Sequence, residues 1–131
     1  MAITVLIVDD DNVVSMTLVR QLSSVGYATK TAATSAEALK LAAREPFAAI
    51  FVDYHLPDNN GVRLMGQLRE LQAQAKLVMT TGWNENAVRG ELQQARLADC
   101  QILPKPWAFN QVLTIVATAA RASEASATKK N

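Results

Sequence analysis

The sequence predicts an α/β domain in which five parallel strands alternate with five helices in a doubly wound sheet. The chain has 131 residues and half of them are apolar, which is enough for one compact domain with a core of its own. Short apolar runs alternate along the chain with segments whose apolar residues recur at helical spacing. Strict alternation of this kind favours a parallel sheet with right-handed crossovers and helices on both faces.

Five strand-like runs stand out by their composition. They are residues 4–8, 28–32, 48–53, 76–80 and 100–103. The first, third and fourth runs are almost entirely apolar, as is typical of parallel strands that helices cover on both faces. The second run, "ATKTA", is more polar, so we expect it at an edge of the sheet.

Helical segments between these runs are marked by apolar spacing and by signals at their ends. The apolar markers are Val14, Leu18, Leu22 and Val25 for the first helix, Val62, Met65 and Leu68 for the third, Val88, Leu92 and Ala95 for the fourth, and Val112, Val116, Ala119 and Ala120 for the fifth. Thr34 and Glu37 form a T-x-x-E capping box that begins the second helix. Gly26 is expected just past the end of the first helix, and Asn84 is expected to cap the fourth.

Residues 1–121 are predicted to form the domain. Residues 122–131, "ASEASATKKN", are small and polar without periodicity, so they are predicted to be a disordered tail or the stub of a linker. By their spacing, Met16, Met65 and Met79 are expected in the core.

Composition excludes several classes of protein. Lys and Arg number 13 against 12 Asp and Glu, a net charge of +1, so neither a nucleic-acid surface nor a polybasic membrane surface is expected. Cys100 is the single cysteine, which rules out an internal disulfide and is expected as a core thiol. The chain has no apolar run as long as a membrane span and no signal-peptide pattern, so a cytoplasmic protein is expected.

Polar side chains follow the predicted strands at the points where they end. The first strand runs into Asp9, Asp10 and Asp11, the third ends at Asp53, the fourth ends at Thr80 and Thr81, and Lys105 lies just beyond the fifth. The carboxyl ends of parallel strands meet at one edge of the sheet, which is where ligands bind. Four of the twelve acidic residues are therefore expected in one crevice, beside a lysine and two hydroxyls.

This set of side chains points to metal-assisted phosphoryl chemistry. Several carboxylates in a small space need a cation, and hard oxygen ligands suit Mg²⁺. A lysine and a hydroxyl next to that metal suit the oxygens of a phosphoryl group, and an aspartate carboxylate is a known nucleophile for phosphoryl transfer. Asp11 fits better as a helix N-terminal residue than as a ligand, and Asp58 and Asn59 are expected to form a turn before Gly61.

The sequence resembles the receiver domains of two-component response regulators. The resemblance covers about residues 3–120 and rests on "VLIVDDD", "AAIFVDYHLPDNNG", "MTTG" and "LPKPW", which occur in the family's order and spacing. It implies a flavodoxin-like fold with strand order 2-1-3-4-5. It also implies that Asp53 matches the phospho-accepting aspartate and that Lys105 matches the lysine that pairs with phosphoryl oxygens.

The resemblance also assigns a switch hydroxyl. Thr81 matches the hydroxyl that turns toward the phosphoryl group. Thr80 is an alternative by sequence alone, but Gly82, which follows Thr81, favours Thr81. Among varying positions, Ile102 stands where many receivers carry Tyr or Phe, which puts a swinging aromatic ring in doubt. Trp83 is placed to flank the crevice or pack on the surface, whereas Trp107 is expected to pack in the core or at a hinge.

Metal ligands follow from the same resemblance. Asp10 matches the carboxylate that binds Mg²⁺ directly, and Asp9 matches one that acts mostly through water. The phospho-accepting Asp53 is itself part of the metal site. His55 would offer its backbone carbonyl, while its side chain is expected to face solvent. Lys105–Pro106 matches a peptide bond that is cis in the family, and Gly61 matches the glycine that ends the loop after the acceptor.

Two rival classes of function stay open at this point. "DDDNV" also fits the D-x-D-x-V pattern of haloacid-dehalogenase-like phosphatases, with Asp9 as nucleophile and Asp11 as acid/base. That interpretation lacks an acidic pair after Lys105, where only Glu124 remains, and it leaves Asp53 without a role. The other rival is a binding module, either a flavin-binding domain, which the three carboxylates disfavour, or a receiver that is never phosphorylated.

We therefore predict a signalling phospho-acceptor. A sensor histidine kinase or a histidine phosphotransfer protein would donate to Asp53 with Mg²⁺, and no other cofactor is expected. The protein would catalyse only its own phosphorylation and dephosphorylation, so it is not expected to be an enzyme with a separate substrate. The face formed by the fourth helix, fifth strand and fifth helix would act on an output partner or a covalent effector domain, without direct nucleic-acid or membrane binding.

Overall fold

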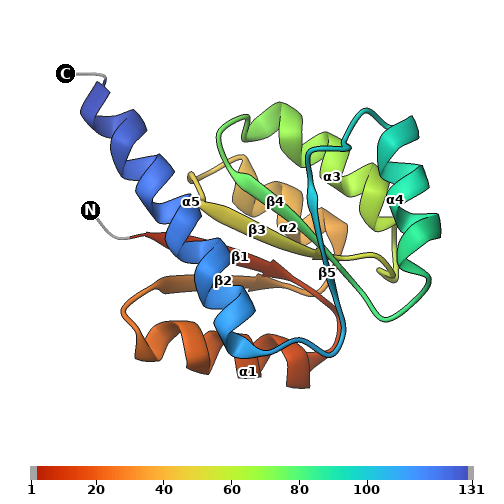
Figure 1. Cartoon of the computed structure of the whole chain (residues 1–131), viewed down its shortest axis with the longest axis horizontal. Coiled ribbons are helices and arrows are strands. Elements are labelled where there is room, and N and C mark those ends of the chain that lie inside the picture. The colour runs from red at the N-terminus through yellow and green to blue at the C-terminus, as the bar shows by residue number, and fades with distance from the viewer. Residues whose placement is uncertain (1–2, 130–131) are drawn as a thin grey trace.

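A single five-stranded sheet lies between two layers of helices in the computed structural model, which describes residues 3–129 (Figure 1). The strands are β1 (Thr4–Val8), β2 (Ala28–Ala32), β3 (Ala49–Asp53), β4 (Lys76–Thr81) and β5 (Gln101–Pro104). They pair in parallel in the order β2-β1-β3-β4-β5. The predicted fold class and strand order are confirmed, with β2 at an edge, and strand ends differ from prediction by one residue at most.

Five helices connect the strands and cover both faces of the sheet. They are α1 (Asn12–Ser24), α2 (Ser35–Ala42), α3 (Gly61–Leu71), α4 (Glu85–Gln94) and α5 (Phe109–Lys129). Helices α1 and α5 lie on one face, and α2, α3 and α4 lie on the other (Figure 1). Because all five strands are parallel, their carboxyl ends lie at the same edge of the sheet.

Local signals begin and end the helices as the sequence predicts. Asp11 caps α1, because its Oδ1 accepts from the Val13 N–H at 2.9 Å. Thr34 caps α2 through the Glu37 N–H at 3.2 Å, and Asn84 caps α4. After α1, Gly26 has a φ of +95°, a backbone conformation that glycine adopts without strain.

Apolar side chains of each inner strand alternate between two hydrophobic clusters. Leu6 and Val8 of β1 join the cluster under α2, α3 and α4, whereas Val5 and Ile7 join the cluster under α1 and α5. Cys100 is buried in the first of these clusters, as predicted. Each face of the sheet is thus closed by its own apolar layer, and the polar side chains are left to the edges.

The expectation for Met16 is wrong. Met65 and Met79 are fully buried, but Met16 is 56% exposed on α1. The buried positions of α1 are Ser15, Leu18 and Leu22. Met16 lies one residue beyond Ser15, about 100° around the helix axis, and this rotation turns it away from the sheet.

Helix α5 extends beyond the apolar positions that hold it to the sheet. Among the residues of α5 up to Glu124, whose burial the structure describes, Ala119 and Ala120 are the last buried ones, and the helix continues to Lys129 and projects past the sheet (Figure 1). Residues 122–129 are therefore helical where the sequence predicts a disordered tail or the stub of a linker. Ala, Ser and Glu without Gly or Pro permit propagation from a packed helix. The boundary at residue 121 stays a prediction, and residues 130–131 lie outside the described part.

None of the helices within residues 3–129 has the length and hydropathy needed to cross a membrane.

Candidate functional site

The acidic residues predicted for one crevice do meet at the carboxyl edge of the sheet. Asp9 and Asp10 directly follow β1, and Asp53 is the last residue of the neighbouring strand β3. Each of the three carboxylates offers an oxygen, and these oxygens all lie within 4.8 Å of one another. Asp9 and Asp53 are buried, whereas Asp10 is exposed. Parallel pairing of β1 with β3 brings these residues together although 44 positions separate Asp9 from Asp53 in the sequence.

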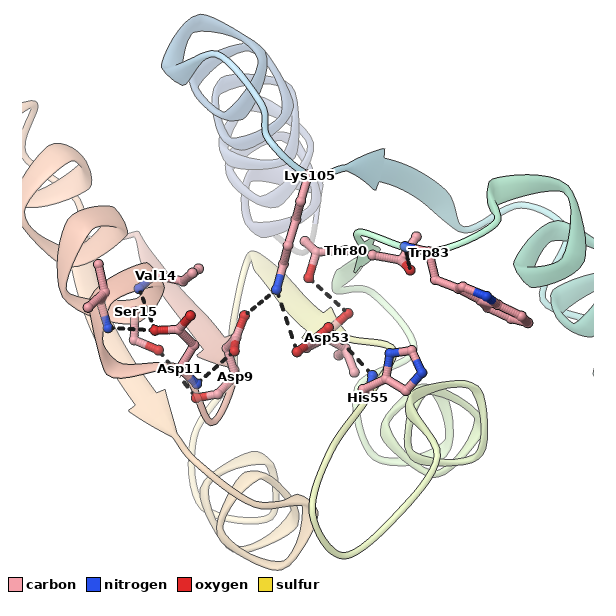
Figure 2. A network of polar contacts seen from close by, with 12 residues as sticks. Asp9, Asp11, Val14, Ser15, Asp53, His55, Thr80, Trp83 and Lys105 are labelled. Carbon is pink, nitrogen blue, oxygen red and sulfur yellow. Dashed lines mark hydrogen bonds and ion pairs between the residues drawn. The ribbon is translucent and has the colours of Figure 1, made fainter.

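Lys105 lies between the two buried carboxylates. Its Nζ is 3.0 Å from Asp9 Oδ2 and 3.5 Å from Asp53 Oδ2, and it reaches them from the end of β5 (Figure 2). Asp9 also accepts from the Asp11 N–H at 2.9 Å. One cation thus faces a cluster of three carboxylates, which leaves net negative charge for a metal ion to neutralise.

Burial and charge shift the pKa values of the central pair. Burial, followed by the nearby Asp9 charge, raises the pKa of Asp53, although Lys105 and the His55 N–H act in the opposite direction. For Lys105, burial alone would lower the pKa, but the hydrogen bond to Asp9 and the charges of Asp53 and Asp9 outweigh it and raise the pKa. Lys105 is therefore protonated at neutral pH, whereas the surroundings of Asp53 disfavour its charged form.

The loop from Asp53 to α3 passes close to the site. The His55 N–H lies 3.5 Å from Asp53 Oδ1, and His55 forms an isolated bridge with Asn60. The His55 side chain is exposed, as predicted. Gly61 begins α3 against the strand end, where an added Cβ would lie 2.5 Å from Asp53 O and 2.8 Å from Tyr54 Cα. Only glycine fits this close approach, which explains the residue type at the end of the loop.

Both candidate hydroxyls are buried at the end of β4, and they have different partners. Thr80 is the residue of β4 that pairs with Asp53, and its Oγ1 donates to Val52 O at 3.4 Å. Thr81 Oγ1 accepts from the Trp83 N–H at 3.0 Å. Thr81 is also held to the lysine, because the Lys105 N–H donates to Thr81 O at 2.8 Å. The Lys105–Pro106 peptide bond is cis, as the resemblance implies.

An aromatic cluster next to the site was missed by the sequence analysis. Trp83 is 52% exposed and stacks on Tyr54 with ring centroids 5.6 Å apart. The His55 ring makes an edge contact with Tyr54 at 4.8 Å. The Tyr54 hydroxyl donates to Glu91 of α4, and this hydrogen bond is the first cause that raises the pKa of Tyr54. Trp83 lies beside the site (Figure 2), and Trp107 packs against the apolar cluster under α1 and α5.

Asp58 has a second role besides the predicted turn. Its carboxylate accepts from the Ser35 N–H at 2.9 Å, the Ser35 hydroxyl at 2.8 Å and the Ala36 N–H at 3.2 Å. These donors are at the N-terminus of α2, so the loop that follows Asp53 is bound to a neighbouring helix. The backbone hydrogen bond from Ser35 is the first cause that lowers the pKa of Asp58. No local sequence signal pairs residues 23 positions apart.

Comparison with known proteins identifies the family. The sequence family described as response regulator receiver domain matches residues 5–117. The chain belongs to this family. Receiver domains are signalling phospho-acceptors that pair with histidine kinases or phosphotransfer proteins.

The curated relatives of this receiver domain are longer proteins, and the chain matches only a part of each. The response regulator MprA of Mycobacterium sp. (strain KMS) is 32% identical over 113 residues, which cover 86% of this chain and 48% of that protein. The sensor kinase CckA of Brucella abortus is 32% identical over 117 residues, 86% of this chain but 12% of that protein. The chain thus spans about half the length, or much less, of the relatives it matches.

Solved structures share the fold. A response regulator from Burkholderia pseudomallei, whose crystal structure has a phosphorylated aspartic acid, a calcium ion and citrate, is 35% identical with a TM-score of 0.78. The match covers 97% of this chain and 72% of that one. A CheY-like receiver domain protein from Methanospirillum hungatei is 27% identical with a TM-score of 0.84, over 95% and 98% of the two chains. Family and structure together argue against the phosphatase and flavin interpretations, and the acidic cluster fits a metal ion.

Proposed function

We propose that Asp53 is the phospho-acceptor of this receiver domain and that Asp9 and Asp10 complete a Mg²⁺ site beside it. The observation that carries the proposal is the cluster of three carboxylates within 4.8 Å, with Lys105 between Asp9 and Asp53. Oxygen ligands of this kind suit a hard divalent cation, which would neutralise the charge of carboxylates and phosphoryl oxygens. Asp10 and Asp53 would bind Mg²⁺ directly, Asp9 would act mostly through water, and His55 would offer its backbone carbonyl.

The protein's own residues position the reacting groups. A carboxylate oxygen of Asp53 attacks the phosphorus of a phosphohistidine on the partner, the P–N bond breaks, and the imidazole leaves with the electron pair. An acyl phosphate on Asp53 and a free histidine result. Lys105 balances charge on the phosphoryl oxygens, and the Thr81 hydroxyl donates to one of them. The pKa of Asp53 is raised first by burial of the carboxylate and then by the nearby Asp9 charge, and a bound divalent cation would favour the charged form.

Partners follow from the same proposal. The donor is a sensor histidine kinase or a histidine phosphotransfer protein, and the modification changes binding of an output partner or of an effector domain in the same polypeptide. The protein modifies only itself and has no separate substrate to turn over. Direct nucleic-acid binding by this domain is not proposed. The cytoplasmic location that the sequence suggests stays a prediction.

Intact-mass measurement after incubation with Mg²⁺ and acetyl phosphate tests the proposal. We expect one phosphoryl adduct on the parent protein and none on Asp53→Asn, because an amide does not accept the group. Asp10→Asn and Lys105→Ala should slow adduct formation by about 10²-fold, the scale of removing one charge-stabilising group. Asp9→Asn should slow it less. The matched control is Asp99→Asn, a carboxylate at the opposite edge of the sheet that pairs with Arg69, and it should react at the parent rate.

Two outcomes would contradict the proposal. An adduct that survives Asp53→Asn and disappears in Asp9→Asn, together with repeated turnover of phosphate esters, would assign the nucleophile to Asp9 and restore the phosphatase interpretation. No adduct on the parent protein from acetyl phosphate or from a phosphorylated histidine phosphotransfer protein would indicate a receiver that works without phosphorylation.

A further inference from the structure

Tyr54 links the acceptor strand to helix α4 through its side chain. It follows Asp53 directly, is 8% exposed, and donates from its hydroxyl to Glu91 Oε2 on α4. Its backbone N–H donates to Thr80 O at 2.9 Å, so the same residue is held to β4. The strand that ends in Asp53, the neighbouring strand and helix α4 are therefore connected through one residue.

The loop that begins α4 meets the same ring. Trp83 stacks on Tyr54 with an interplanar angle of 27°. Its backbone N–H donates to Thr81 Oγ1 at 3.0 Å, so the position of Trp83 depends on where the Thr81 hydroxyl lies. The next residue, Asn84, is the N-cap of α4 and accepts from the Ala87 N–H at 3.1 Å. A displacement of Trp83 thus passes through one peptide bond to the start of the helix.

Helix α4 has little apolar contact to hold it otherwise. Of its ten residues only Val88 and Leu92 are buried, and Gly90 near its middle weakens the helix. Helices derive most of their stability from packing of an apolar face, so a helix with a thin apolar stripe depends more on each polar contact. The hydrogen bond from Tyr54 to Glu91 is such a contact, and it involves a charged acceptor, which strengthens it.

We propose that the Tyr54–Glu91 hydrogen bond holds α4 in the unphosphorylated protein and that Trp83 transmits the state of Thr81 to this bond when Asp53 is phosphorylated. The inference rests on the proposed function, because it takes the Thr81 hydroxyl to bind a phosphoryl oxygen. A hydroxyl that turns toward Asp53 gives up the Trp83 N–H, which then needs another partner. Trp83 shifts on the Tyr54 ring, Asn84 moves with it, and Glu91 leaves the Tyr54 hydroxyl. This route needs no aromatic ring at Ile102 in β5.

Amide hydrogen exchange of α4, read by mass spectrometry with and without acetyl phosphate and Mg²⁺, tests the proposal. Tyr54→Phe keeps the ring and its stacking but removes the hydroxyl, so α4 should exchange about tenfold faster before phosphorylation, and phosphorylation should add little. Glu91→Gln keeps a neutral acceptor and should give a smaller change in the same direction. It also provides a second test of the hydrogen bond if Tyr54→Phe folds poorly. Trp83→Ala should leave the hydrogen bond in place but reduce the response of α4 to phosphorylation.

The matched control is Tyr27→Phe, the other tyrosine of the chain, which packs against the cluster under α1 and α5. It should behave as the parent protein does in both states. If the adduct forms and α4 of Tyr54→Phe exchanges as in the parent in both states, the proposal is wrong. It is also wrong if Trp83→Ala keeps the full response. If the parent protein forms no adduct, the intact mass shows that the proposed function itself has failed, and the coupling fails with it.

Discussion

The two edges of the sheet use buried polar side chains in opposite ways. At the carboxyl edge, Asp9 and Asp53 are buried close together and share a single lysine. At the amino edge, Gln72 at the end of α3 is also buried, but every part of its amide has a partner. Its Oε1 accepts from the Phe47 N–H at 2.9 Å, and its Nε2 donates to Ala42 O at 2.9 Å and to Glu45 O at 2.6 Å.

This difference separates a stabilising edge from a reactive one. A neutral amide with satisfied donors and acceptors ties the ends of α2 and α3 together and strengthens the fold. Like charges held in a crevice weaken the fold but leave carboxylates available to a metal ion and a phosphoryl group. The proposed function thus assigns stability to one end of the sheet and chemistry to the other, and replacing Gln72 and replacing Asp53 should change stability with opposite sign.

The largest expected effect is at the amino edge. Gln72→Ala should lower the free energy of unfolding by about 2–4 kcal/mol, because it leaves one buried N–H and two carbonyls without partners. Urea unfolding followed by circular dichroism measures this change. Gln74→Ala, an exposed glutamine two residues away, is the control and should change stability by less than about 0.5 kcal/mol. A Gln72 variant as stable as the control would remove the contrast between the edges.

An effect of opposite sign is expected at the carboxyl edge. Asp53→Asn should raise the free energy of unfolding at pH 7 without Mg²⁺ by about 1 kcal/mol, because it relieves burial of a charge near Asp9. The pKa of Asp53 is raised in the folded protein, so its charge destabilises the fold above the unfolded pKa. The gain should therefore vanish as the pH falls below that value.

Mg²⁺ sharpens the test of the carboxyl edge. It should stabilise the parent protein by mass action and stabilise Asp53→Asn much less, since a ligand that binds only the folded state raises its stability. Thermal unfolding of each protein with and without Mg²⁺ measures the stabilisation of the parent and of Asp53→Asn. An Asp53→Asn protein that is less stable than the parent in the absence of metal would show that the carboxylate is a structural group after all.

The smallest effect distinguishes two carboxylates at the same edge. Asp58 is fastened by three donors from α2, and its pKa is lowered, so its charge stabilises the fold above the unfolded pKa. Asp58→Asn should be less stable than the parent at neutral pH, by less than Gln72→Ala, and this deficit should fade as the pH falls through the lowered pKa. Glu70→Gln, an exposed carboxylate on α3, serves as the control. A deficit that persists unchanged in acid would mean that shape, and not charge, matters at Asp58.

Much of the candidate site follows from the sequence because its assembly depends on topology. Asp9, Asp53 and Lys105 each come at the end of a strand, and parallel pairing brings strand ends together whatever the packing details are. The caps at Asp11, Thr34 and Asn84 are equally local, since each residue bonds the backbone two or three positions ahead. The spacing of apolar residues along the chain and the order of the parallel strands therefore determine the fold class and the position of the site.

Other features depend on how the elements pack, and no local pattern specifies this. The rotation of α1 decides that Ser15 and not Met16 faces the sheet. The docking of α4 brings Glu91 to Tyr54, 37 positions away, and the docking of α2 brings Ser35 to Asp58. Each of these contacts depends on the angle and offset at which a helix lies on the sheet, which are set by the side chains of several elements at once. The sequence by itself determined which groups lie at the carboxyl edge, and only the tertiary structure decided which of them are tied to α2 and α4.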